Sequence, residues 1–436
     1  MSIWSRFENW GHFVSGILMC VLGICLIFFN TYFVAGVTWW TGILLTLVGL
    51  FRAVEVFLPK HKAQGSKARL LNLVSALAHI ILGTIVMTWS GDAAKLLSFG
   101  VGLYQLMIGL VSLFTYYLLQ KDRAKGRLKE LVIGLITFFW GIGTLLSTRS
   151  VRDTLVLVGI YVIFIGITWL IDARDLLMTD KTKQRKRRRW RVGVPVFFTM
   201  LIPADIHSKI NHLLNDEVSP EEVEETLIPQ VKKKVKGDPV LKVFIHVSEG
   251  IFGSVGHVDL SYKGRVYSYG SYDVDSERVF SAVGDGCFFT LDDKDYITYC
   301  LEYGKTLFEY RVALTKEQQE AFEKKLKELE DMTVPWELTS ETQKASYMGL
   351  MVNRFHAETY KFTKSRFKTY FVLGTNCVLL ADQLIGTSGL DLITMVGILS
   401  PGTYYEYFHK EYQKPNSIVV GETIHNASLN ISEVEE

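Results

Sequence analysis

The first 171 residues alternate between long apolar stretches and short polar breaks. Each apolar stretch is close to the roughly 17–25 residues that a membrane-spanning helix needs. The pattern therefore predicts six transmembrane helices in an all-α bundle. No cleavable signal peptide is expected, because the first stretch runs almost directly into the second and lacks a clear small-residue cleavage site. The six stretches cover residues 13–30, 34–51, 71–89, 96–119, 131–147 and 154–171.

Small residues recur seven positions apart in these stretches, and this repeat divides them into three similar hairpins. Seven residues make about two helical turns, so each helix keeps one narrow face, which favours close packing in lipid. Residues 10–175 resemble the HdeD-like family of six-helix bacterial membrane proteins, which is linked to acid resistance. The resemblance implies the fold and carries no catalytic motif. The pairs are Gly16/Gly23 with Gly42/Gly49, Ala76/Gly83 with Gly102/Gly109, and Gly134/Gly141 with Gly159/Gly166.

Basic residues gather in alternate loops of this region. Five lie between residues 52 and 69 and five between 121 and 129. The positive-inside rule then predicts that both termini are cytoplasmic. A basic run at 181–191 is expected to contact membrane lipids, or to act as a simple topology anchor. The apolar segment 192–203 is short and holds two prolines, so we expect it to lie at the interface or to form a buried entry to the next domain. A seventh crossing would place the following domain outside.

The composition changes from membrane-like to soluble near residue 205. With 49% hydrophobic residues, the whole chain of 436 residues is too apolar for an ordinary soluble protein, and most of the excess precedes residue 172. Ser219-Pro220 begins a charged linker helix. The predicted organisation is a transmembrane domain at 1–175, a basic juxtamembrane segment with the linker helix at 176–239, a soluble domain at 240–415 and a disordered tail at 416–436.

Strand signals dominate the soluble domain. Lys263-Gly264 predicts a tight hairpin, and Thr315 with Gln318 predicts a capping box that starts a charged helix. Further helices are expected at 340–359 and from Cys377, with a strand at 367–373 between them. These elements predict an α+β domain with an antiparallel sheet. The strands are expected at 240–247, 257–262, 265–269, 287–291 and 307–314.

The pair Asn376-Cys377 stands directly before an apolar helix, and His257 opens a strand far upstream. A helix N-terminus and an imidazole both favour the thiolate, which is the nucleophilic form of cysteine. From the residues alone, a buried helical thiol and an ordinary strand histidine remain the alternative. His246, also on a strand, is a rival base.

Three short motifs in this order resemble the circularly permuted papain-like hydrolases, which include lecithin:retinol acyltransferase-like and NlpC-type proteins. The motifs are Gly-His-Val-Asp-Leu at 256–260, Val-Tyr-Ser-Tyr-Gly at 266–270 and Thr-Asn-Cys-Val-Leu-Leu at 375–380. The resemblance implies that Cys377 is the nucleophile, His257 the base and Asn376 a supporting residue. Many relatives carry a second histidine or an acid on the second strand. Here that place falls to Tyr269, with Ser268, Ser271 and Asp273 close by.

The predicted function is a membrane-anchored cysteine hydrolase or acyltransferase that acts in the cytoplasm on an amide or ester of an amphiphilic or peptide substrate. The alternative is a non-catalytic stress-response or scaffold protein with a papain-like binding domain. If 192–203 crosses the membrane, cell-wall peptide becomes the substrate. No metal or cofactor is predicted, because the five cysteines form no CxxC pattern and no phosphate-binding loop is seen. A net charge of +2 gives no case for nucleic acid.

Overall fold

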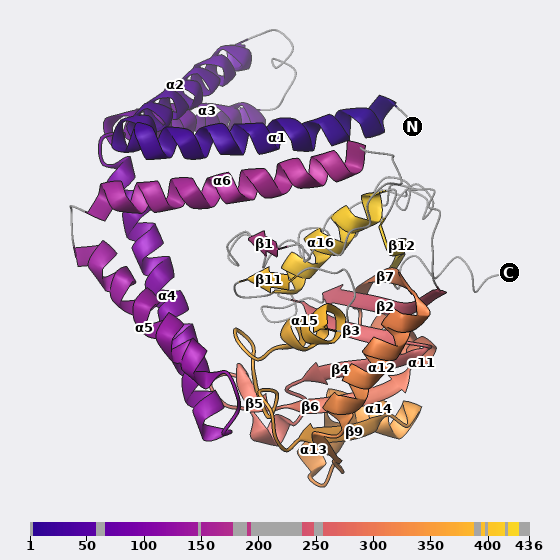
Figure 1. Cartoon of the computed structure of the whole chain (residues 1–436). Helices are drawn as coiled ribbons and strands as arrows, with labels where there is room; N and C mark the ends of the chain where they lie inside the picture. The colour runs from indigo at the N-terminus through magenta and orange to yellow at the C-terminus, as the bar shows by residue number, and fades with distance from the viewer. Residues whose placement is uncertain are drawn as a thin grey trace, which may run out of the picture. The chain divides into compact units, whose positions relative to one another are not determined.

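A computed structural model describes residues 3–57, 66–146, 150–177, 190–192, 238–247, 256–387, 394–396, 400–414 and 417–426 (Figure 1). The chain divides into two compact units. One contains residues 10–110 and 132–170, and the other contains residues 1–9, 111–131 and 171–436. The segment 193–237 lies outside the described residues, and with it most of the predicted interfacial segment and the linker helix.

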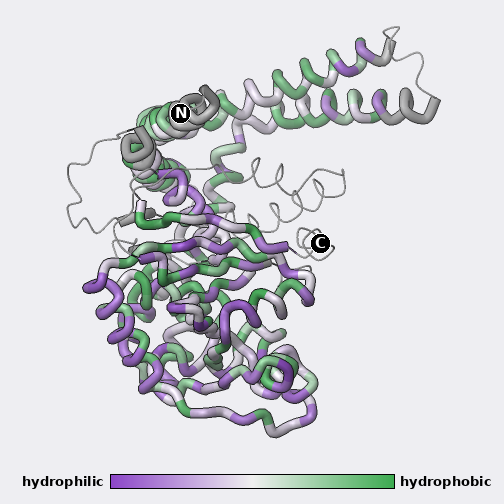
Figure 2. Tube along the Cα trace, turned by 90° about the vertical axis from the view of Figure 1, so that its right-hand side faces the viewer, coloured by the Kyte–Doolittle hydropathy of each residue, from purple (hydrophilic) through white to green (hydrophobic). Residues whose placement is uncertain are grey.

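The N-terminal region is helical, and each predicted apolar stretch falls mainly within one helix. Among the residues that the structure describes, four segments are long and apolar enough to cross a membrane: 30–55, 93–121, 127–146 and 151–171. Two shorter apolar segments are 13–28 and 72–88. Figure 2 shows hydrophobic residues along much of these helices. The helices are α1 Ile3–Phe28, α2 Asn30–Phe57, α3 Ser66–Thr88, α4 Ala93–Lys121, α5 Arg127–Leu146 and α6 Ser150–Leu177.

The repeated glycines lie where helix backbones approach closely. A Cβ added at Gly42 would lie 2.7 Å from the Gly83 carbonyl oxygen, and one added at Gly23 would lie 2.5 Å from that of Gly159. Real Cβ atoms essentially never come this close, so a larger residue would push the helices apart. These contacts join α2 to α3 and α1 to α6. The predicted narrow faces are therefore confirmed at these contacts, which lie between the predicted hairpins and not within them.

The described part of the C-terminal region is built on an antiparallel sheet of eight strands in the order β12-β7-β2-β3-β4-β6-β9-β8. The predicted strands and the antiparallel sheet are confirmed. The strands are β2 Asp238–Val247, β3 His257–Tyr262, β4 Arg265–Gly270, β6 Cys287–Asp292, β7 Thr306–Leu314, β8 Thr333–Pro335, β9 Glu358–Phe362 and β12 Val419–His425. Two smaller sheets pair β5 Val283–Asp285 with β10 Thr369–Phe371, and β1 Trp190–Val192 with β11 Thr394–Val396.

Helices cover both faces of the large sheet because alternate strand residues point to opposite sides. On β2, Val243 belongs to the apolar cluster that includes Cys377, whereas Phe244 belongs to the cluster that includes Cys300. The first cluster packs α12, α15 and α16 against the sheet, and the second packs α11 and α14. These helices are α11 Asp293–Glu302, α12 Lys316–Glu330, α14 Tyr347–Phe355, α15 Cys377–Thr387 and α16 Pro401–Gln413.

Two expectations about the C-terminal region need correction. The helix expected at 340–359 is instead α13 Glu341–Ala345 and α14, followed by strand β9. His356 ends α14 in a left-handed conformation with φ 56°. The chain changes direction there and continues into β9. The tail expected from residue 416 contains β12, which pairs with β7 at the sheet edge. The capping box of Thr315 and Gln318 on α12 is present as predicted.

Candidate active site

Asn376 and Cys377 form the start of α15. The Asn376 side-chain oxygen accepts a hydrogen bond from the Leu379 backbone N–H at 3.0 Å, which makes Asn376 the N-cap. Its amide nitrogen donates to the Val372 carbonyl at 2.9 Å, so the cap also fixes the preceding turn. Cys377 is thereby held in the first turn of the helix, 4% exposed. Cys377 therefore lies beside the partial positive charge of a helix N-terminus.

His257 opens β3 and has polar groups around its Nε2 atom. The Tyr272 hydroxyl lies 2.9 Å away, Asp259 Oδ1 lies 3.1 Å away and Ser268 Oγ lies 3.4 Å away. Asp259 follows two residues after His257 on the same strand, so both side chains point to the same face. The carboxylate is thus placed by strand geometry to pair with the imidazole.

The charged groups near His257 favour its protonated form. Burial lowers the pKa of His257, but the charges of Asp259 and Cys377, with hydrogen bonds to both groups, raise it overall to about 10. The pKa of Asp259 is held well below its usual value: burial raises it, and His257 with the hydrogen bond from His246 more than offsets this. The structure therefore brings Cys377 and His257 into electrostatic contact and supplies a carboxylate that supports an imidazolium.

His246 contacts the other oxygen of the same carboxylate. Its Nε2 lies 3.0 Å from Asp259 Oδ2, which also accepts a short hydrogen bond from the Tyr296 hydroxyl. Burial and the charge of Lys305 lower the pKa of His246 to about 4, so this histidine is neutral near pH 7. A neutral His246 is a hydrogen-bond donor that holds Asp259. His246 therefore fits the role of a residue that positions Asp259 better than the role of a rival base.

Tyr269 does not have the position that the sequence suggested. Its hydroxyl donates to the backbone carbonyls of Phe367 at 3.0 Å and Thr375 at 3.2 Å. Tyr269 belongs to the apolar cluster of Cys377, whereas its neighbour Ser268 approaches His257, because successive strand residues face opposite sides. The groups that contact the imidazole instead are Asp259, on the same strand as His257, and Tyr272, which follows β4. Asp259 stands within the 256–260 motif, and its spacing of two residues from His257 is the sequence signal that could have predicted this role.

Replacing Tyr269 by phenylalanine is expected to loosen the turn before Cys377 without changing the chemistry of His257. Each lost hydrogen bond contributes on the order of 1 kcal/mol to the free energy of unfolding. Thermal unfolding of the full chain in detergent measures this loss, and the pH profile of Cys377 alkylation measures the chemistry. A shifted pH profile with unchanged stability would restore the orienting role to Tyr269.

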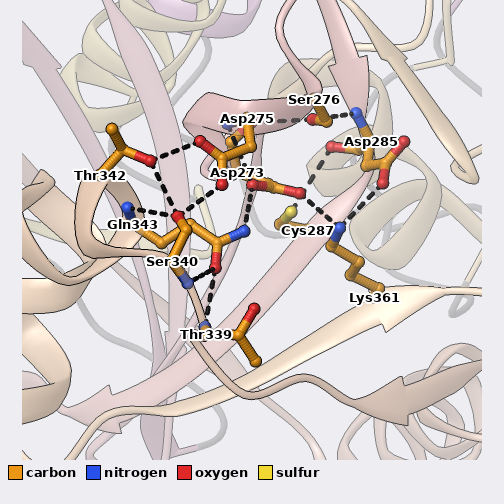
Figure 3. A network of polar contacts seen from close by, with 10 residues as sticks. All are labelled: Asp273, Asp275, Ser276, Asp285, Cys287, Thr339, Ser340, Thr342, Gln343 and Lys361. Carbon is orange, nitrogen blue, oxygen red and sulfur yellow. Dashed lines mark hydrogen bonds and ion pairs between the residues drawn. The ribbon is translucent and has the colours of Figure 1, made fainter.

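Asp273, another neighbour considered as the orienting residue, lies in a separate polar network (Figure 3). Its carboxylate accepts from Lys361 at 2.5 Å and from the Gln343 side chain at 2.7 Å. Lys361 also reaches Asp285 at 2.8 Å, so the network joins the segment after β4 to α13 and β9. Cys287 lies beside this network, and burial raises the pKa of its thiol to about 12. These contacts indicate a structural role.

The side chains of His246, His257 and Asp259 could together hold a metal ion, because one donor atom from each lies within 4.8 Å of the others. The sequence gave no sign of this cluster, since its members come from two strands and match no metal-site spacing. A metal would have to displace the proton of His257, whose pKa is raised to about 10. The contacts as they stand suit ion pairing and hydrogen bonding between these groups.

Comparison with known proteins bears on the helical region. Residues 14–88 and 74–146 match the family described as "Short repeat of unknown function (DUF308)", as two overlapping copies. This family is typical of HdeD-like membrane proteins, and with the apolar helices it indicates membrane association. No curated protein and no solved structure matches the chain. The matched residues therefore lie in the helical region, and the sheet domain contains none of them.

Proposed function

We propose that the chain is a membrane-associated cysteine hydrolase or acyltransferase whose sheet domain is a permuted papain-like domain. The observation that carries the proposal is that His257 lies 3.1 Å from Asp259 Oδ1 and interacts with Cys377 by charge and hydrogen bonding, and both groups raise its pKa. A thiol at a helix start, an imidazole and a carboxylate are the three parts of a nucleophile, base and orienting group. Asn376 supports the set as the helix cap.

In the proposed reaction, Cys377 starts as a thiolate beside protonated His257. The sulfur bonds to the carbonyl carbon of an ester or amide, and the backbone N–H of Cys377 at the helix start helps to hold the resulting oxyanion. When the carbonyl re-forms, the C–O or C–N bond breaks and the leaving group takes a proton from His257. The product of this half-reaction is a thioester on Cys377.

The second half-reaction regenerates the ion pair. Neutral His257 takes a proton from water or from an acceptor hydroxyl or amine, whose oxygen or nitrogen attacks the thioester. The C–S bond breaks and returns the thiolate. Since His257 Nε2 faces Asp259, the Nδ1 atom is the one that serves the thiol in this scheme. Asp259 stays ionised throughout and stabilises the imidazolium.

The substrate class follows from location and is also a proposal. The basic loops favour a sheet domain on the cytoplasmic side, where an enzyme bound to a membrane meets amphiphilic or lipidated esters and amides. A crossing within residues 192–203 would instead place it outside, beside cell-wall peptide. A reporter fused after Glu436 separates these cases, because a cytoplasmic signal fits the first and an external signal fits the second.

A non-catalytic binding domain is the second candidate, and the burial of Cys377 favours it, since only 4% of this residue is exposed. The two candidates differ in thiol reactivity. If His257 supports a thiolate, Cys377 is expected to react with iodoacetamide near neutral pH at least about tenfold faster than Cys287 or Cys300. Burial raises the pKa of the latter two thiols to about 12 and about 11.

The control for this measurement is a histidine elsewhere in the same domain. His257→Gln should slow alkylation of Cys377 alone, whereas His409→Gln should not, because His409 pairs with Glu422 at 2.9 Å. Equal alkylation of all three thiols, unchanged in His257→Gln, would support the binding domain.

A chelator should leave the rate of Cys377 alkylation unchanged. An increase in this rate would indicate a metal at His246, His257 and Asp259.

A further inference from the structure

The loop at Val279–Ala282, just before β5, has an unusual backbone. Val279, Phe280 and Ser281 have φ angles of 52°, 54° and 64°, so three successive residues with side chains are left-handed. This conformation is disfavoured for residues with a Cβ, and most of all for a β-branched valine. The loop is closed by Arg278 and Val283, which exchange backbone hydrogen bonds of 2.7 and 3.2 Å. Strain of this kind points to a functional reason for the shape.

The strained backbone displays apolar side chains. Phe280 is 93% exposed, the highest fraction of any large apolar side chain among the described residues, and Val279 is 60% exposed. Within the soluble part of the described chain, most other large apolar side chains are buried. A phenylalanine and a valine that are exposed to water contribute no burial free energy to offset the strain of the loop. We therefore expect an apolar partner to cover the tip.

The base of the loop packs against α4 within the same compact unit, which contains residues 111–131. Val283 and Phe371 form an apolar cluster with Leu118 of α4, and the Phe371 ring lies 5.1 Å from that of Phe114. The Ala282 carbonyl accepts from the Val372 N–H at 3.0 Å, which ties the loop itself to this contact.

The part of α4 in this contact lies at the edge of its membrane span. A helix of 29 residues is about 43 Å long, which exceeds a hydrocarbon core of about 30 Å, so turns at the ends of α4 extend beyond the core. Tyr116 and Tyr117, followed by Lys121, have the aromatic and basic character of a membrane–water interface. The loop base therefore lies at the level of the interface.

We propose that Val279 and Phe280 insert into the lipid bilayer that α4 crosses, with the exposed Arg278 at anionic headgroups. Within the loop, the Ser281 hydroxyl donates to the Glu277 carboxylate at 2.5 Å, so this acid is engaged by a side chain of the loop itself. The membrane offsets the cost of the left-handed turn by covering its apolar tip. The loop shares no residue with the proposed catalytic site, so this inference does not rest on the proposed function.

Photocrosslinking of the full chain tests the inference. Phe280 is replaced by benzoylphenylalanine, and the protein is irradiated in vesicles of equal parts phosphatidylcholine and phosphatidylglycerol. The peptide containing residue 280 is expected to carry phospholipid adducts, at least fivefold more than the same substitution at Leu350, an exposed apolar residue on α14. The substitution at Val279 provides a second position if the first variant fails to fold.

Two results would overturn the inference. Equal lipid labelling at positions 280 and 350 would mean that the loop has no special contact with the bilayer. Adducts to a second copy of the protein, with no lipid adduct at position 279 or 280, would mean that the apolar tip is a protein interface. Neither result would bear on the Cys377 chemistry, because the readout needs no turnover.

Discussion

Replacing Cys377 by serine is expected to lower turnover of an activated ester, such as a p-nitrophenyl ester, by about 10³-fold or more. A serine hydroxyl is far harder to deprotonate than a thiol, and His257 with Asp259 is arranged to support a thiolate. Release of nitrophenol by the full chain in detergent or vesicles measures the loss. The matched control is Cys300→Ser, since Cys300 is a buried residue of α11 and burial raises the pKa of its thiol to about 11.

The control should keep its turnover provided that the domain stays folded. If Cys377→Ser keeps more than about a tenth of the wild-type turnover, Cys377 is not the nucleophile. Ester cleavage would then come from another group or from surface residues. Equal losses in both variants would point to a general effect of changing a buried cysteine.

Replacing Asp259 by asparagine is expected to have the second largest effect. It keeps the shape of the side chain and removes the charge that raises the pKa of His257, so this pKa should fall from about 10 toward its ordinary value near 6.5. Alkylation of Cys377 at pH 7 should slow by about tenfold or more. The free energy of unfolding should fall by about 3 kcal/mol, since removing one partner of a buried charge pair is costly and His257 limits the cost by losing its proton.

The pH dependence of stability supplies an independent check on the same pair. A histidine whose folded pKa is raised contributes stability that is fully present below about pH 6.5 and is lost as the pH rises through about 10. The pKa of Asp259 is lowered, so its contribution is present above about pH 4 and is lost as the pH falls. The wild type should therefore lose stability between about pH 7 and 10, and Asp259→Asn should show much less of this loss.

The matched control for this variant is Asp275→Asn, at an exposed carboxylate that accepts from Thr342 at 2.6 Å. It should leave the Cys377 alkylation rate and the alkaline stability profile as in the wild type. An unchanged alkaline profile in Asp259→Asn would contradict the assigned ion pair.

Local sequence patterns predicted the elements that local physics determines. The spacing of small residues revealed the close contacts between helices, Thr315 and Gln318 revealed a helix start, and the pair Asn376-Cys377 revealed the capped start of α15. Each of these residue patterns lies within a few residues of the structural feature that it predicts. Tyr269 was the expected orienting group, but its hydroxyl contacts Phe367 whereas its neighbour Ser268 approaches His257, because neighbouring strand residues face opposite sides and a motif does not show which side faces His257.

Other features depend on residues far apart in the chain. The edge strand β12 pairs with β7 more than 100 residues earlier, so its ordered state has no strong local signal. His246 and Tyr296 meet at Asp259 only because the sheet and α11 bring them together. The left-handed loop at Val279 likewise has no glycine to mark it.

The acyl intermediate on Cys377 tests the central claim most directly. The full chain is mixed with a p-nitrophenyl ester, quenched in acid within the first turnovers and digested for mass spectrometry. We expect one acyl group on the peptide that contains Cys377, formed and lost at the rate of turnover, and at least tenfold less of it in His257→Gln. Acyl groups spread over several cysteines and lysines at the same rates in both proteins would contradict the Cys377–His257 assignment.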